Sequence, residues 1–366
     1  MVKPYVIGID MGGTNTAFGI VDARGTVIAS NSIKTRKHSK IEDYIDELYT
    51  EISRLIEAND AQDKIQGIGI GAPNANYFTG VIEDGVNLPW PTPIPLAKLV
   101  SEKFGIPVAI TNDANAAAIG EMTYGAARGL KDFIMITLGT GVGSGFVANG
   151  EMIYGHDGFA GEFGHVIVER GGRECGCGRK GCLEAYASAI GIKRTAFELM
   201  ATMNDKSPLR DISFNDMDSA ILYQHALKGD PIAKEAFRLT GMRLGYALAD
   251  AVTITSPEAI FVFGGLAKAI GEVDKRKERW LKGEAKYHRV LKRKSHYVII
   301  GGNDMVPGIV SELLDVMQNT TGTYTAEYIL IQTSRDVESF RRELFSTLTI
   351  DQQQKIIIYY GNRNSE

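Results

Sequence analysis

One local pattern occurs twice in the chain, and this repetition constrains the fold more than any other feature of the sequence. Residues 5–22 read YVIGIDMGGTNTAFGIVD, and residues 133–150 read FIMITLGTGVGSGFVANG. Each copy is a strand pattern that enters a glycine-rich turn and leaves it as a second strand. The repetition predicts two related lobes, each of which presents a phosphate-binding turn to a shared ligand.

The first copy does not match a dinucleotide-binding fingerprint. That fingerprint requires its glycines to open a helix. The residues after Gly12 and Gly13 continue instead as the strand patterns AFGIVD and TVIASNSI. The turn therefore opens a hairpin, which excludes a Rossmann site at this position.

Both turns are suited to hold phosphate groups. Asp10 stands at the end of a strand, next to backbone amides that Gly12, Gly13 and Thr14 leave accessible. Consecutive N–H groups of this kind cradle phosphate oxygens, and Asp10 is placed to hold a hydrated Mg²⁺ ion on them. A tight hairpin that needs glycine only for its backbone angles is the alternative. The second turn, at residues 139–143, favours the phosphate interpretation.

The rest of the first 269 residues alternates between helix and strand patterns, as an α/β fold requires. The alanine-rich helix begins at Asn112 or Asp113, directly after a strand. The predicted helices are 41–58, 112–125, 188–204 and 216–254, and the predicted strands are 65–73, 106–111 and 258–269, the last running into a glycine turn.

Asp113, at this strand-to-helix junction, has two interpretations. Asparagine and aspartate are common helix N-caps, and such a cap stabilises a protein by about 1 kcal/mol. An aspartate can instead accept the proton of a substrate hydroxyl during phosphoryl transfer. Residue type alone favours the cap.

All three cysteines of the chain lie within eight positions, at Cys175, Cys177 and Cys182, and His165 lies ten residues upstream of the first. An odd number of thiols and a reducing cytoplasm argue against a disulfide. One imidazole and three thiols instead suit tetrahedral Zn²⁺ in a closed, structural site. The C-x-C-x₄-C spacing differs from the usual C-x₂-C pairs, and three reduced thiols in a glycine-rich loop are the alternative.

Composition narrows the classes of partner. The net charge of −4 on 366 residues predicts no general affinity for nucleic acid or an anionic membrane. No apolar run approaches the roughly 18 residues of a spanning helix, and the first residues, MVKPYVIGID, lack the features of a signal peptide. We therefore expect a cytoplasmic protein with no nucleic-acid or membrane partner.

The composition changes after Ala269. Residues 274–294 are strongly basic, and we interpret 270–295 as a solvated linker, with contact to anionic polymers as the alternative. The pattern over 296–366 is then strand, helix, strand, helix, strand. It predicts a separate Rossmann-like βαβαβ half unit.

Part of this last segment, residues 296–361, resembles the nucleotide-binding domain of regulator-of-potassium-conductance proteins. The resemblance rests on HYVIIGGNDMVPGIVSELL and EYILIQTSRD. The glycines at 301–304 do not form the G-x-G-x-x-G fingerprint.

Taken together, several segments resemble the ROK family (repressors, open reading frames, kinases) and, within it, the bacterial glucokinases. The motifs are GIDMGGTNTAFGIVD, TNDANAAAIGE, ITLGTGVGSGFV, GEFGHV and CGCGRKGCLEAYAS, in family order over about residues 4–269. The resemblance implies an actin-like ATPase (ribonuclease H-like) α/β fold, with lobes at 1–120 and 121–269 and with ATP and sugar in the cleft. Further helix and strand segments close the C-terminal lobe in that family, and no match for them follows residue 269.

The resemblance also implies roles for single residues. Asp113 takes the place of the catalytic base. The sugar ligands are matched by Asn112, Asp113, Glu162, His165 and Glu184. The zinc ligands are matched by His165, Cys175, Cys177 and Cys182, within the loop 161–186. The ATP contacts are matched by Asp10, Gly12, Gly13, Thr14, Asn15, Gly139, Thr140, Gly141, Gly264 and Gly265.

The expected activity is ATP-dependent phosphorylation of a hexose, most readily glucose to glucose 6-phosphate, with Mg²⁺-ATP and a structural Zn²⁺. The alternatives are a kinase for N-acetylhexosamines or another hexose, and a sugar-binding module made inactive by its altered C-terminus. Repressors of the family carry an N-terminal helix-turn-helix, and here the phosphate hairpin starts by residue 5. Family members are often dimers, which is the basis for expecting a homodimer.

Overall fold

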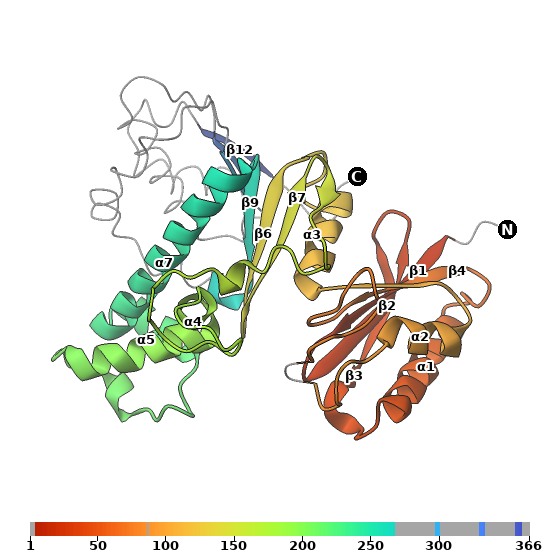
Figure 1. The fold of residues 1–366 in the computed structure, drawn as a ribbon, viewed down its shortest axis with the longest axis horizontal. Coiled ribbons are helices and arrows are strands. Elements are labelled where there is room, and N and C mark those ends of the chain that lie inside the picture. Colours follow the sequence, from red (N-terminus) through yellow and green to blue (C-terminus); the bar gives the residue numbers. More distant parts are fainter. Residues whose placement is uncertain (1–3, 86–87, 268–296, 301–328, 334–355, 361–366) are drawn as a thin grey trace. The chain divides into compact units, whose positions relative to one another are not determined.

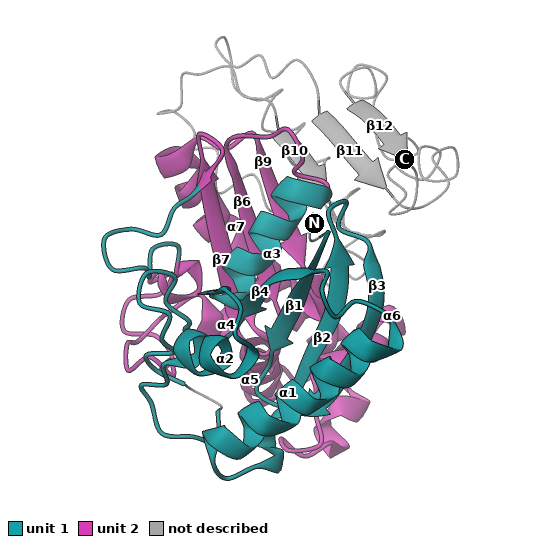
Figure 2. Ribbon diagram, turned by 90° about the vertical axis from the view of Figure 1, so that its right-hand side faces the viewer, with its two compact units in different colours: residues 1–124, 152–161 teal, residues 125–151, 162–366 magenta. Residues whose placement is uncertain are grey.

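The computed structural model describes residues 4–85, 88–267, 297–300, 329–333 and 356–360 (Figure 1). The chain divides into two compact units, shown in different colours in Figure 2. Unit 1 comprises residues 1–124 and 152–161, and unit 2 comprises residues 125–151 and 162–366. The predicted lobe boundary at 120–121 lies close to the first crossing, but the chain also returns to unit 1 for the segment 152–161.

Unit 1 is built on a five-stranded mixed sheet in the order β3-β2-β1-β4-β5. The first three strands form antiparallel pairs, and β4 and β5 are then added in parallel. The strands are β1 (Tyr5–Met11), β2 (Asn15–Asp22), β3 (Val27–Lys34), β4 (Ile65–Gly71) and β5 (Val108–Thr111).

Helices of unit 1 bury their apolar stripes against this sheet. The helix α1 packs on β2, β3 and α2, while α2 contacts β5 and α3 contacts β4. Helix α1 directs Tyr44, Ile45, Leu48 and Ile52 into the core, at the three- and four-residue spacing of one helix face. The elements are η1 (Thr35–Lys37), α1 (Ile41–Ala58), α2 (Leu96–Phe104) and α3 (Asp113–Tyr124).

Unit 2 repeats the strand order of unit 1, which confirms the prediction of two related lobes. Its sheet runs β12-β11-β10-β9-β6-β7-β8, so that β8-β7-β6-β9-β10 corresponds to β3-β2-β1-β4-β5. The hairpin β6–β7 is antiparallel, and β9 and β10 follow in parallel. The strands are β6 (Phe133–Leu138), β7 (Val142–Ala148), β8 (Glu151–Met152), β9 (Ala259–Phe263), β10 (Tyr297–Ile300), β11 (Ile329–Thr333) and β12 (Ile356–Tyr360).

The C-terminal strands differ from the prediction of a separate half unit over 296–366. Strands β10, β11 and β12 fall within the three predicted strand patterns and are parallel, but β10 pairs with β9 and so extends the sheet of unit 2. A buried parallel strand has the same apolar sequence whether it opens a new sheet or extends one. The predicted helices between these strands and the linker at 270–295 lie outside the described residues.

Helices of unit 2 cover its sheet with a second apolar core. The predicted helical segment 216–254 is two helices, because Gly229 adopts a positive φ of 94° and Asp230 then caps a new helix that begins with Pro231. The elements are η2 (Phe163–His165), α4 (Glu184–Ala187), α5 (Ala189–Thr202), η3 (Pro208–Asp211), α6 (Ser219–Leu227) and α7 (Pro231–Thr255).

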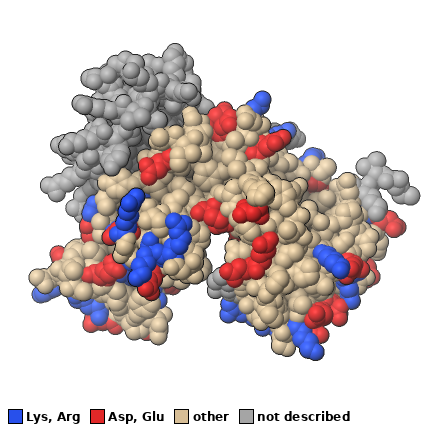
Figure 3. Space-filling model, in the orientation of Figure 1, with Lys and Arg blue, Asp and Glu red and all other residues tan. Residues whose placement is uncertain are grey.

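The described surface carries charges of both signs. Figure 3 shows basic and acidic side chains on the same face of the molecule, in keeping with the small net charge of the sequence. Within the described residues, no helix is both long enough and apolar enough to cross a membrane.

The core of unit 1 gives a first test of this fold. Ile52 on α1 is fully buried, whereas Ile28 on β3 is 44% exposed. Replacing Ile52 by alanine leaves a cavity, and we expect a loss of about 2–5 kcal/mol in the free energy of unfolding. The matched change Ile28→Ala should lose less than about 1 kcal/mol. Urea unfolding of both variants measures this, and equal losses would contradict the assigned faces.

Candidate functional site

The first glycine-rich turn presents two backbone N–H groups to solvent. The Gly12 N–H donates to the Asn15 carbonyl at 3.0 Å and closes the turn. Among the described residues, none accepts a hydrogen bond from the N–H of Gly13 or Thr14. Lys34, across the sheet from Asn15, donates through Nζ to the Asn15 Oδ1 at 2.7 Å. The turn therefore has the consecutive accessible amides that bind an anion.

A glycine brings two carboxylates together beside this turn. Asp10 pairs in register with Gly71 of β4, and a Cβ added to Gly71 would lie 3.5 Å from the Cα of Asp113 and 3.1 Å from the Ala116 Cβ. Asp10 is exposed, yet protein atoms displace part of its hydration. This desolvation, together with the negative charge of Asp113, raises the pKa of Asp10. A pair of this kind is suited to attract a divalent cation.

Asn112 and Asp113 both lie at the start of α3. The Ala114 N–H donates to the Asn112 Oδ1 and to the Asp113 Oδ1, at 2.8 Å each. Because α3 begins at Asp113, Asn112 is the N-cap, and Asp113, the cap that the sequence favoured, is the first helical residue. Among the described residues, no group bonds to the second oxygen of Asp113, and the side chain is exposed. The hydrogen bond from Ala114 therefore leaves one carboxylate oxygen of Asp113 available to a substrate.

The second glycine-rich turn repeats the first in unit 2. The Gly139 N–H donates to the Gly141 carbonyl at 3.0 Å, and no described residue accepts from the N–H of Thr140 or Gly141. The Val142 N–H donates to the Glu184 Oε2 at 3.0 Å. Glu184 lies so close that a Cβ on Gly141 would come within 2.5 Å of this oxygen. Glu184 thereby fixes the turn next to the cysteine loop.

The predicted glycine turn after β9 lies against the end of β6, directly before the second glycine-rich turn. Gly264 has a φ of 108°, and a Cβ there would lie 2.1 Å from the carbonyl oxygen of Leu138, the residue before Gly139. Gly265 begins a helix. Only glycine permits this approach of the two turns.

His165 and the three cysteines form a compact cluster of metal-binding atoms. All four ligand atoms lie within 4.8 Å of one another. The Sγ atoms of Cys177 and Cys182 are 3.7 Å apart, and the His165 Nδ1 is 3.6 Å from the Cys175 Sγ. Tetrahedral Zn²⁺, with its usual bond lengths, separates two sulfurs by about 3.8 Å and a sulfur and a nitrogen by about 3.6 Å. The donor set and these two separations therefore fit this ion.

Two of the three thiols, those of Cys175 and Cys182, disfavour ionisation in the absence of a cation. Burial and the two neighbouring thiols raise the pKa of Cys182 to about 12, and burial also raises the pKa of Cys175. At Cys177 burial is outweighed by hydrogen bonds, first among them the one from the Arg179 backbone, which lower the pKa of this thiol. A bound divalent cation favours the thiolate form of its ligands. The cluster has the chemistry of a metal site.

The loop that carries the cysteines is held in a fixed shape by its own backbone. Isolated bridges pair Ile167 with Cys182 and Glu174 with Lys180. Gly181, at a φ of 84°, lies so close to Glu169 that an added Cβ would be 1.7 Å from the Glu169 carbonyl oxygen. The backbone thus folds tightly around the ligand atoms.

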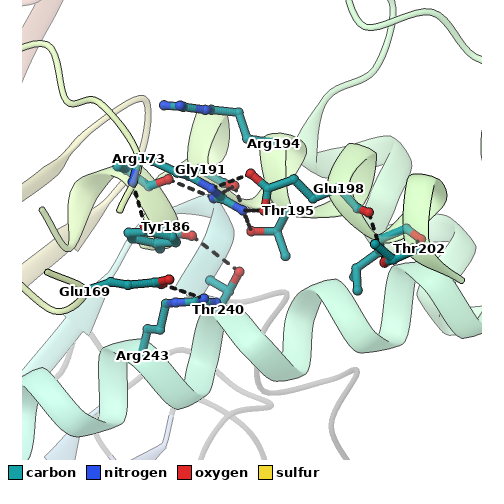
Figure 4. Close-up of polar contacts among 12 residues, drawn as sticks. Glu169, Arg173, Tyr186, Gly191, Arg194, Thr195, Glu198, Thr202, Thr240 and Arg243 are labelled. Atoms are coloured by element: carbon teal, nitrogen blue, oxygen red, sulfur yellow. Dashed lines mark hydrogen bonds and ion pairs between the residues drawn. The ribbon is translucent and has the colours of Figure 1, made fainter. Parts of the chain in front are cut away.

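Arg173 attaches this loop to helix α5, as Figure 4 shows. Its Nε and Nη2 donate to the two carboxylate oxygens of Glu198 at 2.8 and 2.6 Å. The other N–H groups donate to the carbonyls of Ala185 and Gly191 and to the Thr195 Oγ1. Each nitrogen of the Arg173 guanidinium therefore donates to an acceptor, which anchors the loop two residues before Cys175.

Tyr186 of α4 lies between two guanidinium groups. The Cζ atoms of Arg173 and Arg243 each lie 4.4 Å from the centroid of its ring, and Arg243 also binds Glu169 at 2.9 Å. The Tyr186 hydroxyl accepts from the backbone N–H of Arg173 at 2.8 Å. These contacts fix the loop to α4 and α7 by cation–π and hydrogen-bonding interactions.

The predicted site residues divide between the two units. Unit 1 holds the first turn and brings Asp10 close to Asp113, with Asn112 beside it. Unit 2 holds the second turn, Gly264 and Gly265, the metal cluster, Glu162 and Glu184. Sequence reasoning missed Arg173 and Tyr186, because an arginine two residues before a cysteine does not by itself indicate a partner on a later helix.

The raised pKa of Asp10 predicts a pH-dependent stability. A carboxyl with a raised pKa favours folding below its unfolded pKa of about 3.9, and this contribution is lost as the pH rises through the folded value. Without Mg²⁺ or nucleotide, Asp10→Asn should therefore gain stability over the wild type between about pH 3 and pH 7. Asp113→Asn should gain in the same direction because it removes the repelling charge. Urea unfolding at each pH measures this, and a pH-independent difference would contradict it.

The chain is similar in sequence to known sugar kinases and to a xylose repressor. It is 35% identical to the glucokinase of Halalkalibacterium halodurans over 279 residues, which are 74% of this chain and 82% of the relative. An N-acetylmannosamine kinase of Escherichia coli is 31% identical (72% and 84% covered), and a xylose repressor of Caldicellulosiruptor bescii is 28% identical (73% and 67% covered).

The fold has a solved counterpart at similar identity. A ROK family glucokinase from Streptomyces griseus, in complex with glucose and AMPPNP, is 29% identical and superimposes with a TM-score of 0.65 over 83% of this chain and 95% of that chain. The model of the ROK family matches residues 6–297, which include both turns and the metal cluster and end at the first residue of β10. The chain belongs to the ROK family.

Proposed function

We propose that the protein is an ATP-dependent sugar kinase that phosphorylates a hexose, with glucose as its preferred substrate. The observation that carries the proposal is the repeated turn, since each unit presents two adjacent free N–H groups at the same place in the same strand order. The kinase names of several relatives and the glucose complex of the Streptomyces griseus enzyme support it.

Asp113 is the proposed general base. Its second oxygen accepts the proton of the sugar hydroxyl as the hydroxyl oxygen bonds to the γ-phosphorus and the bond to the ADP oxygen breaks. Asp10, next to it, is the residue that would hold Mg²⁺ on the phosphates. The ion, when bound, neutralises charge on the transferring group. The N–H groups of both turns bind the phosphate oxygens.

The sugar is assigned to the polar side chains that match the sugar ligands of the ROK family. A hexose is recognised through its hydroxyl groups, so its site must pair them with acceptors or donors, a role that we assign to Asn112, Glu162 and Glu184. His165 directs Nδ1 toward Cys175, and we assign its Nε2 to a sugar hydroxyl. One ring would then connect the metal to the substrate.

We assign structural Zn²⁺ to the four-residue cluster. Its role is to brace the loop from which Glu162, His165 and Glu184 reach the sugar. This assignment rests on the tetrahedral spacing of the ligand atoms and on the three thiols.

The metal assignment predicts a defined zinc content. Protein purified without chelator should contain about one Zn²⁺ per chain, and His165→Asn should lose most of it, since three ligands bind more weakly than four. The matched variant His156→Asn changes an exposed histidine outside the cluster and should keep the metal. Elemental analysis measures the content, and protease digestion of the loop 161–186 reports its order. Wild-type protein without zinc would remove the assignment.

The proposed base predicts a loss of turnover. Asp113→Asn keeps the shape of the side chain but cannot accept the proton, so kcat should fall by about 10²–10⁴-fold. Asp63→Asn, at an exposed position of the same unit, should retain wild-type kcat. A coupled assay of ADP release over a panel of hexoses measures both variants. Full activity of Asp113→Asn would exclude the assigned role.

The same panel separates the alternatives. An N-acetylhexosamine kinase, which the Escherichia coli relative suggests, would prefer N-acetylmannosamine or N-acetylglucosamine over glucose. An inactive sugar-binding module would bind sugar in calorimetry without turnover. Strand β10, in the place that β5 has in unit 1, favours a complete second lobe and hence the enzyme. Cytoplasmic location and a homodimer stay expectations.

A further inference from the structure

Three hydroxyl groups form a buried chain beneath the first phosphate turn. The Thr16 Oγ1 lies 2.8 Å from the Tyr44 hydroxyl and 2.9 Å from the Thr35 Oγ1. The Thr35 hydroxyl lies 2.7 Å from the carbonyl oxygen of Gly12. All three side chains are fully buried, so their polar atoms depend on one another rather than on water.

The donor and acceptor roles of the three hydroxyl groups follow from their chemistry. A carbonyl oxygen only accepts, so the single proton of the Thr35 hydroxyl points to Gly12. The Thr35 oxygen then accepts from Thr16, and Thr16 accepts from Tyr44. Burial raises the pKa of Tyr44 to about 12, so the phenol keeps its proton at neutral pH.

The segment that follows β3 holds the next two carbonyls of the turn as well. The backbone N–H of Thr35 donates to the Thr14 carbonyl at 3.0 Å, and the Arg36 Nε donates to the Gly13 carbonyl at 2.9 Å. Three consecutive turn carbonyls are therefore bound by two neighbouring residues.

Because the peptide bond is planar, fixing the carbonyl groups of the turn also fixes the direction of the N–H groups that follow them. In a trans peptide the C=O of one residue and the N–H of the next point in opposite directions. Holding the Gly12 carbonyl toward Thr35 therefore directs the Gly13 N–H away from it, and holding the Gly13 carbonyl directs the Thr14 N–H in the same way. These are the two N–H groups of the turn without an acceptor among the described residues.

Tyr44, at the far end of this series of hydroxyl groups, is fixed in the core. The Tyr44 ring packs at 4.7 Å from the ring of Trp90, and the Trp90 Nε1 donates to the His38 carbonyl at 3.1 Å. Tyr44 lies on α1. Its position is thus set by packing, which makes it a rigid support for the two threonines.

We propose that Thr35, supported by Thr16 and Tyr44, is the positioning residue of the first phosphate turn. Its hydroxyl holds the Gly12 carbonyl so that the Gly13 and Thr14 N–H groups are preorganised for the β- and γ-phosphates of the nucleotide. The inference rests on the proposed nucleotide-binding function, and none of the three residues is assigned to touch the substrate.

The test compares variants that remove or keep the hydroxyl donor. Thr35→Val removes it at nearly constant volume, and Thr35→Ser keeps it. Tyr44→Phe removes the start of the chain and keeps the ring on Trp90. Thr50→Val, at an exposed threonine of α1 that bonds only within its helix, is the matched control. Calorimetry with Mg²⁺-ADP, steady-state KM for ATP and for glucose, and melting temperature are measured for each.

Thr35→Val should weaken Mg²⁺-ADP binding and raise the KM for ATP by about 10-fold, as the loss of one buried hydrogen bond implies. The KM for glucose should stay within about 2-fold. Thr35→Ser should restore most of the loss, and Tyr44→Phe should cause a smaller one of about 3-fold. The control should match the wild type.

The inference is overturned if a folded Thr35→Val binds Mg²⁺-ADP as the wild type does, or if the KM values for ATP and glucose rise equally. If Thr35→Val does not fold, Tyr44→Phe decides by the same criteria. A wild type that binds Mg²⁺-ADP but phosphorylates no hexose contradicts the proposed kinase activity alone. A wild type that binds no nucleotide contradicts both.

Discussion

The constraint on which the structure depends is one of backbone hydrogen bonding. Two turns must leave adjacent N–H groups without a protein acceptor, although a folded chain normally pairs such groups. In each unit the requirement is met at the hairpin that begins the sheet, where Gly12 or Gly139 closes the turn with a bond of its own. The strand order around both hairpins is the same, so the same solution appears twice in one chain.

The side chains that support the two turns differ in their chemistry. In unit 1 the support is a set of neutral hydroxyls below the turn, which do not compete with the anion for the amides. In unit 2 the support is a carboxylate, Glu184, that accepts from Val142 and lies beside Cys175. Glu184 therefore ties the second turn to the metal loop, and Arg173 ties that loop to α5.

Much of the fold followed from local sequence patterns. The hairpin at residues 5–22 and the helix at 41–58 have strong periodicity, and their bounds agree with β1, β2 and α1. The repetition of the hairpin correctly indicated two related lobes. The cluster of His165 and three cysteines was also predictable, because ligand chemistry limits what such a set of side chains can bind.

Other features depend on contacts between distant residues and leave little local signal. Strand β10 has an apolar sequence that fits any parallel sheet, so its pairing with β9 is decided by tertiary structure. Thr16 lies in β2, Thr35 in η1 and Tyr44 in α1, and only the fold brings their three hydroxyls together. Three acceptors of the Arg173 guanidinium, on Gly191, Thr195 and Glu198, lie on a helix that begins 16 residues later in sequence, at Ala189.

The use of backbone amides in the turns has a consequence for the choice of phosphoryl donor. An N–H group recognises the oxygens of a phosphate chain and receives no information about the base or ribose attached to it. In each unit, the amides of the turn that have no acceptor among the described residues would not distinguish a nucleotide from another polyphosphate. Under the proposed function, discrimination between adenosine and other nucleosides, or against a phosphate chain with no nucleoside, must then come from the residues that meet the base.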